Sequence, residues 1–400
     1  MVANVSDGDP DTYDVIVLGL GGMGSAAARH LARRGARVLG LEQFTPAHAL
    51  GSSHGDTRIV RMAYFEAPEY VPLLRRAYEL WDELEADTGQ HLFVRAGALM
   101  IGAADSEVVR GTLASAERYD LPHELLDRTA MARRFPQFAL RPGEQAVFER
   151  NAGFVNPEVV VRAHLELAAR DGAELRFETP VTSWRADAGG VVVNTAGGDF
   201  RGRRLIVAAG AWADRMAPGL GAPLQVARRV MHYLQPVAPA ADFAVDRFPV
   251  YVYETGARDA IYGFPWVDDP GGGVKAGFHY RGGEVDPDSV DRDVSAAEQD
   301  EMRAALAERI PGLAGAHLAT KVCMYTLTPD EHFVIEHLPG HDGRVIVAAG
   351  FSGHGFKFTP VVGEILADLA IDGHTALPIG FLSGQRFQEG SVTTVAPSTE

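Results

Sequence analysis

The chain has 400 residues, of which 46% are hydrophobic and 22% are charged, enough to bury a large core in one or two packed domains. Its formal net charge is -16, and because such a surface repels phosphate groups and anionic lipids, we expect neither nucleic acid nor a membrane as a partner. The single cysteine, Cys323, excludes an internal disulfide and indicates a reducing cytoplasm. The segment from Met1 to Tyr13 is polar and acidic, without the features of a secretion signal.

The first 42 residues combine two apolar runs, a glycine-rich turn and a terminal acid. Residues 14–18 predict a buried strand, residues 25–34 a helix that Gly35 ends, and residues 37–41 a second strand. This order, within about thirty residues, is the fingerprint of a dinucleotide-binding fold. The residues that complete the fingerprint are Gly19, Gly21, Gly24 and Glu42.

Each residue of the fingerprint has a physical task. Gly19 permits a tight turn, Gly21 lets the backbone approach a pyrophosphate, and Gly24 lets helix and strand pack closely. The helix N-terminus supplies partial positive charge, and Glu42 can accept hydrogen bonds from a ribose. The sequence therefore predicts a dinucleotide site near the start of the chain.

Later segments extend this fold along the chain. Apolar residues at three- and four-residue spacing predict an amphipathic core helix over residues 69–87, and Asn156 before a proline predicts a helix to about Asp171. Residues 190–206 predict a hairpin. Apolar strands stopped by glycine occur just before Gly210 and again just before Gly350. We therefore expect a discontinuous nucleotide-binding domain, with a second lobe in the segments between.

Two short segments, residues 51–61 and 350–358, mix glycine, histidine and cations in a way that core packing does not require. In an acidic chain, such cations indicate an anionic ligand, although Arg58 and Arg61 would also suit surface ion pairs. Lysine is rare throughout, so each retained lysine is a candidate functional group. The three lysines among the 37 basic residues are Lys275, Lys321 and Lys357.

At these residues the chain resembles the monomeric sarcosine oxidase and N-methyltryptophan oxidase branch of the D-amino acid oxidase-like flavoproteins. The resemblance runs from Tyr13 to about Phe387. Its most specific stretches are residues 51–61, 261–265, 323–326, 330–333 and 350–358. It implies an α/β fold with a Rossmann-type FAD-binding domain, and an α+β second lobe that forms a substrate domain on a mainly antiparallel sheet.

The domain boundaries follow from the pattern and the resemblance together. We assign residues 1–92, 154–226 and 330–400 to the FAD-binding domain. Residues 93–153 and 227–329 form the predicted substrate and catalytic domain.

The resemblance assigns several residues to the flavin. In sarcosine oxidase-like enzymes a cysteine carries the flavin through its 8-methyl group, and Cys323 matches that position, although a lone cysteine is more often an inert buried residue. His54 and Arg58 match residues near the flavin, where a cation stabilises the electron-rich ring. The other cofactor-binding residues that we predict are Thr57, Gly353, His354, Gly355 and Lys357.

Other residues match the substrate site of the family. Arg61 and Lys357 match the pair that holds the substrate carboxylate, for which arginine offers a fork and lysine a point charge. Lys275 matches the lysine that assists the reaction with oxygen, since a fixed positive charge stabilises developing superoxide. The groups that we expect to orient the amine are Tyr262, His279 and Tyr325.

The chain also departs from the family pattern. Ser53 and Met62 occupy positions where we expect histidine, and residues 65–68 replace a smaller segment that contains glycine. Residues 266–273 form a segment about two residues longer than in sarcosine oxidase. These changes either reshape the substrate pocket, through Phe65 and Trp266 among others, or alter surface loops only.

Together these observations predict a monomeric oxidase that converts the C–N bond of a secondary-amine amino acid to an imine and reduces O2 to hydrogen peroxide. A cyclic substrate similar to pipecolate or proline, with an oxidase or dehydrogenase reaction, stays an alternative. An NAD-dependent dehydrogenase would leave the motifs around Cys323 and Lys357 unexplained, and a non-catalytic flavin-binding protein is the third alternative. The 14 histidines show no metalloprotease pattern, so we expect no metal.

Overall fold

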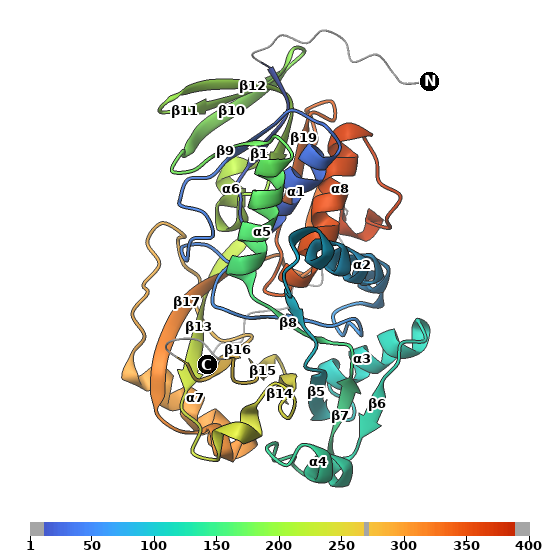
Figure 1. The fold of residues 1–400 in the computed structure, drawn as a ribbon, viewed down its shortest axis with the longest axis vertical. Coiled ribbons are helices and arrows are strands. Elements are labelled where there is room, and N and C mark those ends of the chain that lie inside the picture. Colours follow the sequence, from blue (N-terminus) through green and yellow to red (C-terminus); the bar gives the residue numbers. More distant parts are fainter. Residues whose placement is uncertain (1–11, 268–271, 389–400) are drawn as a thin grey trace. The chain divides into compact units, whose positions relative to one another are not determined.

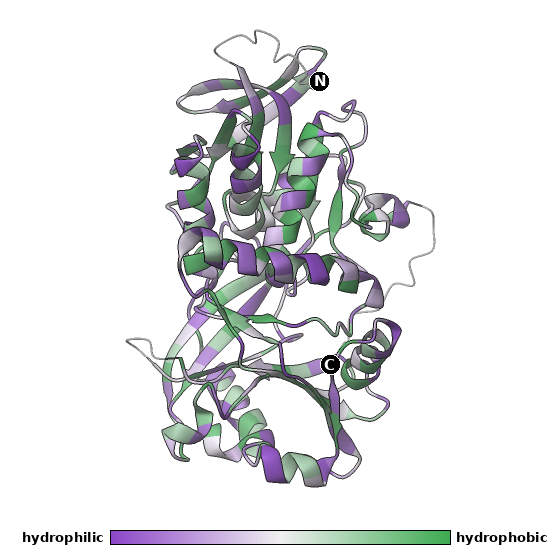
Figure 2. Cartoon of the chain, turned by 45° about the vertical axis from the view of Figure 1, so that its right-hand side comes forward, coloured by the Kyte–Doolittle hydropathy of each residue, from purple (hydrophilic) through white to green (hydrophobic). Residues whose placement is uncertain are grey.

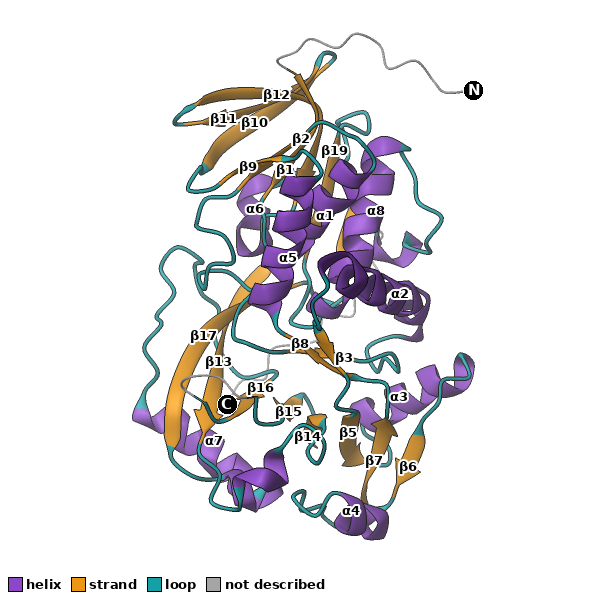
Figure 3. Ribbon diagram, viewed as in Figure 1, coloured by secondary structure: helices purple, strands orange, loops and turns teal. Residues whose placement is uncertain are grey.

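The computed structural model describes residues 12–267 and 272–388, and its elements are shown in Figures 1 and 3. The chain divides into two compact units, each discontinuous in sequence. Unit 1 contains Met1–Ser53, Glu158–Gln225 and Thr326–Glu400; unit 2 contains His54–Pro157 and Val226–Tyr325. The polar segment Met1–Tyr13 falls almost wholly outside the described residues, as does the middle of the 266–273 segment.

Unit 1 is built on a parallel sheet that is extended at one side by an antiparallel hairpin. The strand order is β10-β11-β12-β1-β2-β9, and β19 pairs in parallel with β12 and antiparallel with β18. Its strands are β1 (Thr12–Leu18), β2 (Val38–Leu41), β9 (Glu174–Arg176), β10 (Val181–Asp187), β11 (Gly190–Thr195), β12 (Gly198–Val207), β18 (Val334–His337) and β19 (Val345–Ala349). Its helices are α1 (Gly22–Arg33), α5 (Pro157–Arg170), α6 (Ala213–Met216) and α8 (Thr359–Ile371).

Helices α1 and α8 lie side by side in unit 1 (Figure 1). Their close approach depends on Gly363 of α8, where an added Cβ would lie 2.5 Å from the Cβ of Ala26 in α1. The predicted strands, the hairpin and the helix after the glycine turn are all present. Helix α1 begins at Gly22, three residues earlier than predicted.

Unit 2 is built on a second sheet in which most neighbouring strands are antiparallel. The order is β17-β13-β16-β15-β14-β5-β7-β6, with a parallel pair only between β14 and β5 among the registers described. Its strands are β5 (Ala98–Ala103), β6 (Glu124–Leu126), β7 (Glu144–Glu149), β13 (Gln225–Leu234), β14 (Val250–Gly256), β15 (Asp259–Gly263), β16 (Val274–Phe278) and β17 (His317–Leu327). A smaller antiparallel sheet contains β3 (Arg58–Val60), β8 (Gly153–Val155) and β4 (Phe93–Val94).

The helices of unit 2 are α2 (Val71–Thr88), α3 (Glu107–Arg118), α4 (Arg128–Arg134) and α7 (Ala296–Arg309). Helix α2 is the predicted amphipathic helix, and a 3-10 turn at Pro68–Tyr70 precedes it. Figure 2 shows hydrophobic and hydrophilic bands alternating along the helices, as this pattern requires. No helix in the described part of the chain is long and apolar enough to span a membrane.

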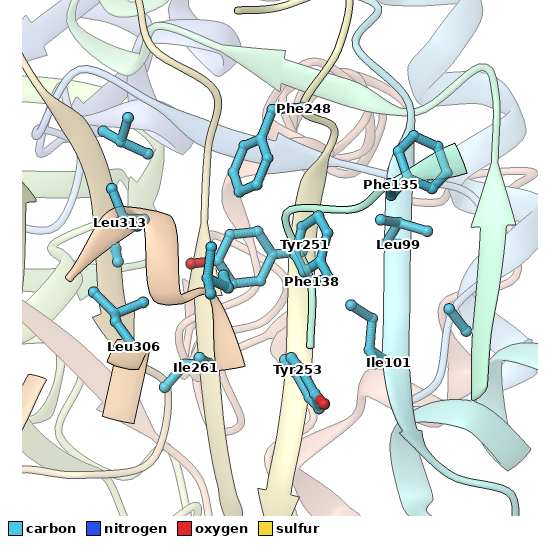
Figure 4. Close-up of a cluster of buried hydrophobic side chains, with 14 of the residues drawn as sticks. Leu99, Ile101, Phe135, Phe138, Phe248, Tyr251, Tyr253, Ile261, Leu306 and Leu313 are labelled. Atoms are coloured by element: carbon cyan, nitrogen blue, oxygen red, sulfur yellow. The ribbon is translucent and has the colours of Figure 1, made fainter. Parts of the chain in front are cut away.

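A large aromatic cluster forms the core of unit 2 (Figure 4). Phe138 stacks on Phe248, with ring centroids 4.9 Å apart, and Tyr251 meets both rings edge-on. Leu99 and Ile101 of β5 and Ile261 of β15 pack in the same cluster. Burial of these large rings makes the sheet a rigid base for the polar residues on its neighbouring strands.

The predicted α/β class with a mainly antiparallel second sheet is confirmed. Residues 54–92, which we assigned to the FAD-binding domain, fall in the same compact unit as the second sheet. The division of the chain into a FAD-binding and a substrate domain stays a prediction.

Candidate functional site

The glycine turn of unit 1 has no room for larger residues. Gly19 has a φ of +89°, and an added Cβ would lie 2.5 Å from the backbone oxygen of Ala208. At Gly24 an added Cβ would lie 1.8 Å from the oxygen of Gly19. Helix α1 starts directly after Gly21, which provides no side-chain cap. The first N–H of the helix, that of Gly22, instead donates to the hydroxyl of Ser53 at 3.0 Å, so the Ser53 side chain binds this helix start.

Glu42 ties the end of β2 to this turn. Its carboxylate accepts hydrogen bonds from the backbone N–H groups of Leu20 at 2.8 Å and Phe44 at 3.0 Å. The side chain is buried, its Oε1 also lies 3.5 Å from Nε2 of His48, and Oε2 keeps a further lone pair for another donor. Glu42 thus has the position that the fingerprint predicts for a ribose ligand, and it also shapes the turn.

The second glycine-rich segment follows β19 in the same unit. Ser352 and Gly353 both have positive φ, and the ring of His354 bonds the backbone oxygen of Glu331 through Nε2 at 2.9 Å. The buried Lys357 donates from Nζ to the backbone oxygen of His354 at 2.6 Å. This segment enters α8 close to the start of α1, since an added Cβ at Gly22 would lie 3.1 Å from the ring of Phe356.

In unit 2, the candidate residues form rows on one face of the second sheet. Alternate residues of a strand share a face, and the register pairs Tyr233 with Lys275 and Met231 with Gly277 between β13 and β16. Tyr262 of β15 lies opposite Gly277. Strand β17, next to β13 on the side away from β16, adds a fourth row to this face: Lys321, Cys323 and Tyr325.

Lys275 holds a loop against this face. Its buried ammonium donates to the backbone oxygen of Gly55 at 2.6 Å, and to the backbone oxygen and the hydroxyl of Thr57 at 2.9 and 3.1 Å. The same ammonium lies 4.7 Å from the ring centroid of Phe264. The two residues predicted for oxygen reactivity and cofactor binding, Lys275 and Thr57, are therefore brought into direct contact.

Asp56 lies between Gly55 and Thr57 in the same loop, and two side chains of the sheet bind its carboxylate. Tyr233 donates its hydroxyl to Asp56 at 2.6 Å, and the Lys321 ammonium lies within 2.6 Å of the same carboxylate. Burial alone would raise the pKa of Asp56, but the hydrogen bonds from Lys321 and Tyr233 hold it below its usual value. Lys321, to which the resemblance assigns no role, therefore binds the same loop as Lys275.

Cys323 lies beside a cation. Arg58 places Nη2 at 3.4 Å from the Cys323 sulfur, donates to the backbone oxygen of Thr57 at 2.8 Å, and approaches the sulfur of Met231 at 4.0 Å. The thiol is buried among Met231 and Tyr233. Cys323 and Arg58, two residues that the resemblance assigns to the flavin, are therefore brought into direct contact.

His54 is buried and has no hydrogen-bond partner for either ring nitrogen within the described ranges. Burial, with further repulsion from Arg58 and Lys275, lowers its pKa to about 3. The imidazole is therefore neutral at pH 7, with one nitrogen able to donate and the other to accept. A buried side chain normally has hydrogen-bond partners, so the two unsatisfied ring nitrogens of His54 indicate that this side chain faces a ligand.

The three residues predicted to orient an amine also contact one another. A hydrogen bond joins the side chains of Tyr262 and Tyr325, and the rings of His279 and Tyr325 are 5.6 Å apart. Burial raises the pKa of both tyrosines. Gly277 makes room for this group, since an added Cβ there would lie 2.8 Å from the Tyr262 hydroxyl.

Arg61 binds a carboxylate of its own chain. Its Nη2 lies 2.7 and 2.5 Å from the two carboxylate oxygens of Glu66, and Nη1 donates to the backbone oxygen of Ala63 at 2.8 Å. The guanidinium also stacks on the rings of Tyr64 and Phe65, 4.3 Å from each centroid. Arg61 lies in unit 2 and Lys357 in unit 1, so their joint binding of one substrate carboxylate stays a prediction.

Several residues of this face were not found from the sequence. The sequence of β13 carries no signal that separates its two faces, because both sets of alternate residues include large or polar side chains. The strand pairing places Arg229, Met231 and Tyr233 on the face described above. Glu149 was also missed. This buried carboxylate accepts from the backbone N–H groups of Met62 and Ala63 at 2.9 and 3.0 Å, and so fixes the segment that follows Arg61.

Comparison with known proteins gives a consistent assignment. The model of the FAD dependent oxidoreductase family matches residues 14–369. The chain is 49% identical over 375 residues to a monomeric sarcosine oxidase of Streptomyces avermitilis, covering 94% of this chain and 98% of that protein. It is 37% identical to an N-methyl-L-tryptophan oxidase of Salmonella arizonae, with 90% and 95% covered.

Solved structures agree in fold. NikD, described as an unusual amino acid oxidase essential for nikkomycin biosynthesis, has a TM-score of 0.81 at 27% identity and covers 93% of this chain and 97% of its own. L-proline dehydrogenase from P. horikoshii has a TM-score of 0.80 at 23% identity, with 96% and 99% covered. The second likeness concerns the fold alone.

Proposed function

The chain belongs to the FAD-dependent oxidoreductase family, and from this premise we propose that it oxidises small amino acids with a secondary amine, namely sarcosine or another N-methyl amino acid. The product is an imine, and O2 is the electron acceptor. The observation that carries this proposal is the 49% identity to a monomeric sarcosine oxidase over 94% of the chain. A cytoplasmic monomer is part of the same proposal.

The residues present fit FAD. The turn at Gly19 and Gly24 has no space for a Cβ, and the start of α1, where the N–H of Gly22 donates to the Ser53 hydroxyl, is the helix N-terminus that would hold a pyrophosphate. His54 supplies two buried ring nitrogens without partners in the described structure. When bound, FAD supplies the acceptor for a hydride equivalent from the carbon next to the substrate nitrogen and passes the electrons to O2.

We propose covalent attachment of the flavin through Cys323. The adjacent Arg58, 3.4 Å from the sulfur, supports this assignment because a fixed cation at that position stabilises an electron-rich flavin ring. Acid precipitation of the purified protein, followed by mass spectrometry of the Cys323 peptide, tests it. Retention of a flavin mass on that peptide is expected. Release of all yellow colour, with an unmodified peptide, contradicts the proposal.

The substrate carboxylate is assigned to Arg61 and Lys357. Both cations are buried, with side chains 3% and 5% exposed, and a buried guanidinium strongly favours a carboxylate partner. The ion pair of Arg61 with Glu66 supports the assignment, because in it Nη2 of the guanidinium already binds both oxygens of a carboxylate. Tyr262, His279 and Tyr325 then orient the amine end of the substrate.

The experiment for the reaction itself is peroxide release by the purified protein with sarcosine, N-methyltryptophan, N-methylalanine, L-proline and L-pipecolate. Primary amino acids serve as controls. We expect turnover of an N-methyl amino acid. Turnover of the cyclic substrates alone would instead assign the alternative class, and flavin bleaching without peroxide would indicate a dehydrogenase. No reaction with any of them, with flavin bound, contradicts the proposal.

A further inference from the structure

Strand β13 runs between the two strands that carry the residues assigned to the amine, with β17 and Tyr325 on one side and β16, followed by His279, on the other. Extending the β13–β16 register from Met231 and Gly277 places Arg229 opposite His279. Arg229 also shares the face of Met231 and Tyr233, which lines the candidate site.

The side chain of Arg229 contacts both neighbours. Its Nε donates to the backbone oxygen of His279 at 3.0 Å, and its Nη1 donates to the backbone oxygens of Arg228 and Gly282 at 2.9 and 3.4 Å. Its guanidinium carbon lies 4.8 Å from the ring centroid of Tyr325. With only 4% of its surface exposed, this arginine is desolvated, and both the cation–π contact and the hydrogen bonds are strengthened accordingly.

We infer that Arg229 is the positioning residue for the amine end of the substrate: it fixes the His279 backbone and the Tyr325 ring as one unit. The inference rests on the proposed function for what Tyr325 and His279 bind, but the contacts of Arg229 do not depend on it. A rigid, planar fork is needed for this task, because one side chain must serve a carbonyl and an aromatic face at once.

The charge of Arg229 adds an electrostatic effect. Burial raises the pKa of Tyr325, and the nearby guanidinium opposes that rise. Tyr325 therefore keeps a more acidic, better-donating hydroxyl than burial alone would leave. Removal of Arg229 releases the ring and weakens its hydroxyl as a donor, and both effects act at the amine and not at the carboxylate.

The chain contains a matched control. Arg309 in α7 is 3% exposed and lies 4.9 Å above the ring of Tyr253, with Nη1 bonded to Glu144 at 2.6 Å. It is a buried arginine on a tyrosine ring in the same unit, outside the candidate site. Arg309→Gln thus reproduces the loss of a buried cation–π pair without touching Tyr325 or His279.

The test uses the flavin-containing enzyme labelled with 3-fluorotyrosine, with the Tyr325 signal assigned through Tyr325→Phe. Arg229→Gln should shift the Tyr325 fluorine resonance and lower kcat/KM for the secondary amine about tenfold or more, while the Kd of acetate, which has a carboxylate but no amine, stays unchanged. Arg229→Lys, which keeps the charge but not the fork, should recover part of the activity. Combining Arg229→Gln with Tyr325→Phe should give less than the product of the single losses.

Arg309→Gln should leave the Tyr325 resonance, kcat/KM and the Kd of acetate unchanged. It should only lower the thermal stability of the protein. An unmoved Tyr325 resonance in Arg229→Gln, or equal losses of kcat/KM in Arg229→Gln and Arg309→Gln, overturns the inference. If the wild-type enzyme turns over no secondary amine, the proposed function fails, and the Tyr325 resonance still decides whether Arg229 positions that ring.

Discussion

Arg61 is paired within its own chain before any substrate arrives. Glu66 offers a carboxylate, as an amino acid substrate does, and holds Nη2 of the guanidinium in a buried setting, with the two side chains 3% and 9% exposed. A substrate carboxylate that binds Arg61 through Nη2 must therefore displace the Glu66 carboxylate. The energy of the internal pair is subtracted from the binding energy of the substrate.

Removal of the competing charge should strengthen carboxylate binding. In Glu66→Gln, we expect the Kd of acetate to fall severalfold, because a neutral amide competes less well for the guanidinium. The measurement is the change in flavin absorbance on titration with acetate. Glu69→Gln is the control, since Glu69 pairs with Arg118 at an exposed position. A weaker affinity in Glu66→Gln would show that Glu66 organises Arg61 for binding and does not compete.

Lys275 and Lys321 both bind the loop at residues 55–57. Comparing them distinguishes a lysine that acts on the reaction through its charge from one that only holds the loop. Lys275 is 3% exposed and Lys321 has a side chain that is 39% exposed, yet both bind this loop. A buried charge acts on a reaction in its surroundings far more strongly than a solvated one.

Lys275→Met should therefore slow reoxidation of the reduced enzyme by O2 at least tenfold while slowing anaerobic reduction by substrate much less. Stopped-flow measurement of the two half-reactions checks this. Lys321→Met is the control, and we expect near-normal rates for it in both halves. Equal slowing of both half-reactions in Lys275→Met, or the same pattern in both variants, would assign Lys275 to holding the loop alone.

At the scale of elements, the β1–α1–β2 segment was predictable because all of its determinants are local. The apolar runs, the glycine spacing and the final acid lie within residues 14–42, and short-range sterics dictate the turn. The start of α1 was placed three residues late because glycines reduce helix propensity. In the structure, close packing on Gly19 and Ala208 overrides that propensity.

The face of the second sheet was only partly predictable. Its individual residues Lys275, Cys323 and Tyr325 came from the resemblance, whereas the strand order β17-β13-β16-β15 depends on pairings between residues far apart in sequence. Arg229 and Tyr233 remained hidden because no motif marks them. Their role follows only from which strands lie on either side of β13.

Gly24→Ala tests the turn as an element. The new Cβ would lie 1.8 Å from the backbone oxygen of Gly19, so the start of α1 must shift away from β1. We expect a folded protein that is purified with less than about a tenth of the normal flavin content, because the helix start no longer presents its N–H groups correctly. The flavin-to-protein absorbance ratio measures this.

Gly35→Ala is the control for this change. Gly35 has a φ of +79°, and an added Cβ there meets no atom within 4 Å. The variant should lose about 1 kcal/mol of stability through backbone strain and keep its flavin. Equal flavin loss in both variants would mean that general destabilisation, and not the geometry of the turn, controls binding.

At the scale of the whole molecule, buried neutral histidines link folding to pH. Burial is the main cause that lowers the pKa of His30 and His54 to about 3, that of His232 to about 4, and that of His164 well below its usual value. Both units contain such residues. In the unfolded chain each of them has a pKa of about 6.5.

Because the folded-state pKa of these histidines is lowered, the unfolded chain takes up protons first as the pH falls. Stability is therefore complete above about pH 6.5 and decreases below it, by about 1.4 kcal/mol per pH unit for each such histidine until its folded-state pKa is reached. We expect the Tm to fall steeply between pH 6.5 and pH 4. Thermal unfolding followed by circular dichroism at several pH values measures this slope.

His164→Met separates this effect from general acid denaturation. His164 is fully buried, and neither ring nitrogen has a hydrogen-bond partner in the described part of the chain, so a methionine of similar size removes the titrating group at little cost in hydrogen bonds. The variant should lose less stability than the wild type between pH 6.5 and pH 4. His374→Gln, at an exposed position, should retain the wild-type slope. If His164→Met leaves the dependence of Tm on pH unchanged, the acid sensitivity comes from the carboxylates, which are protonated over the lower part of the same pH range.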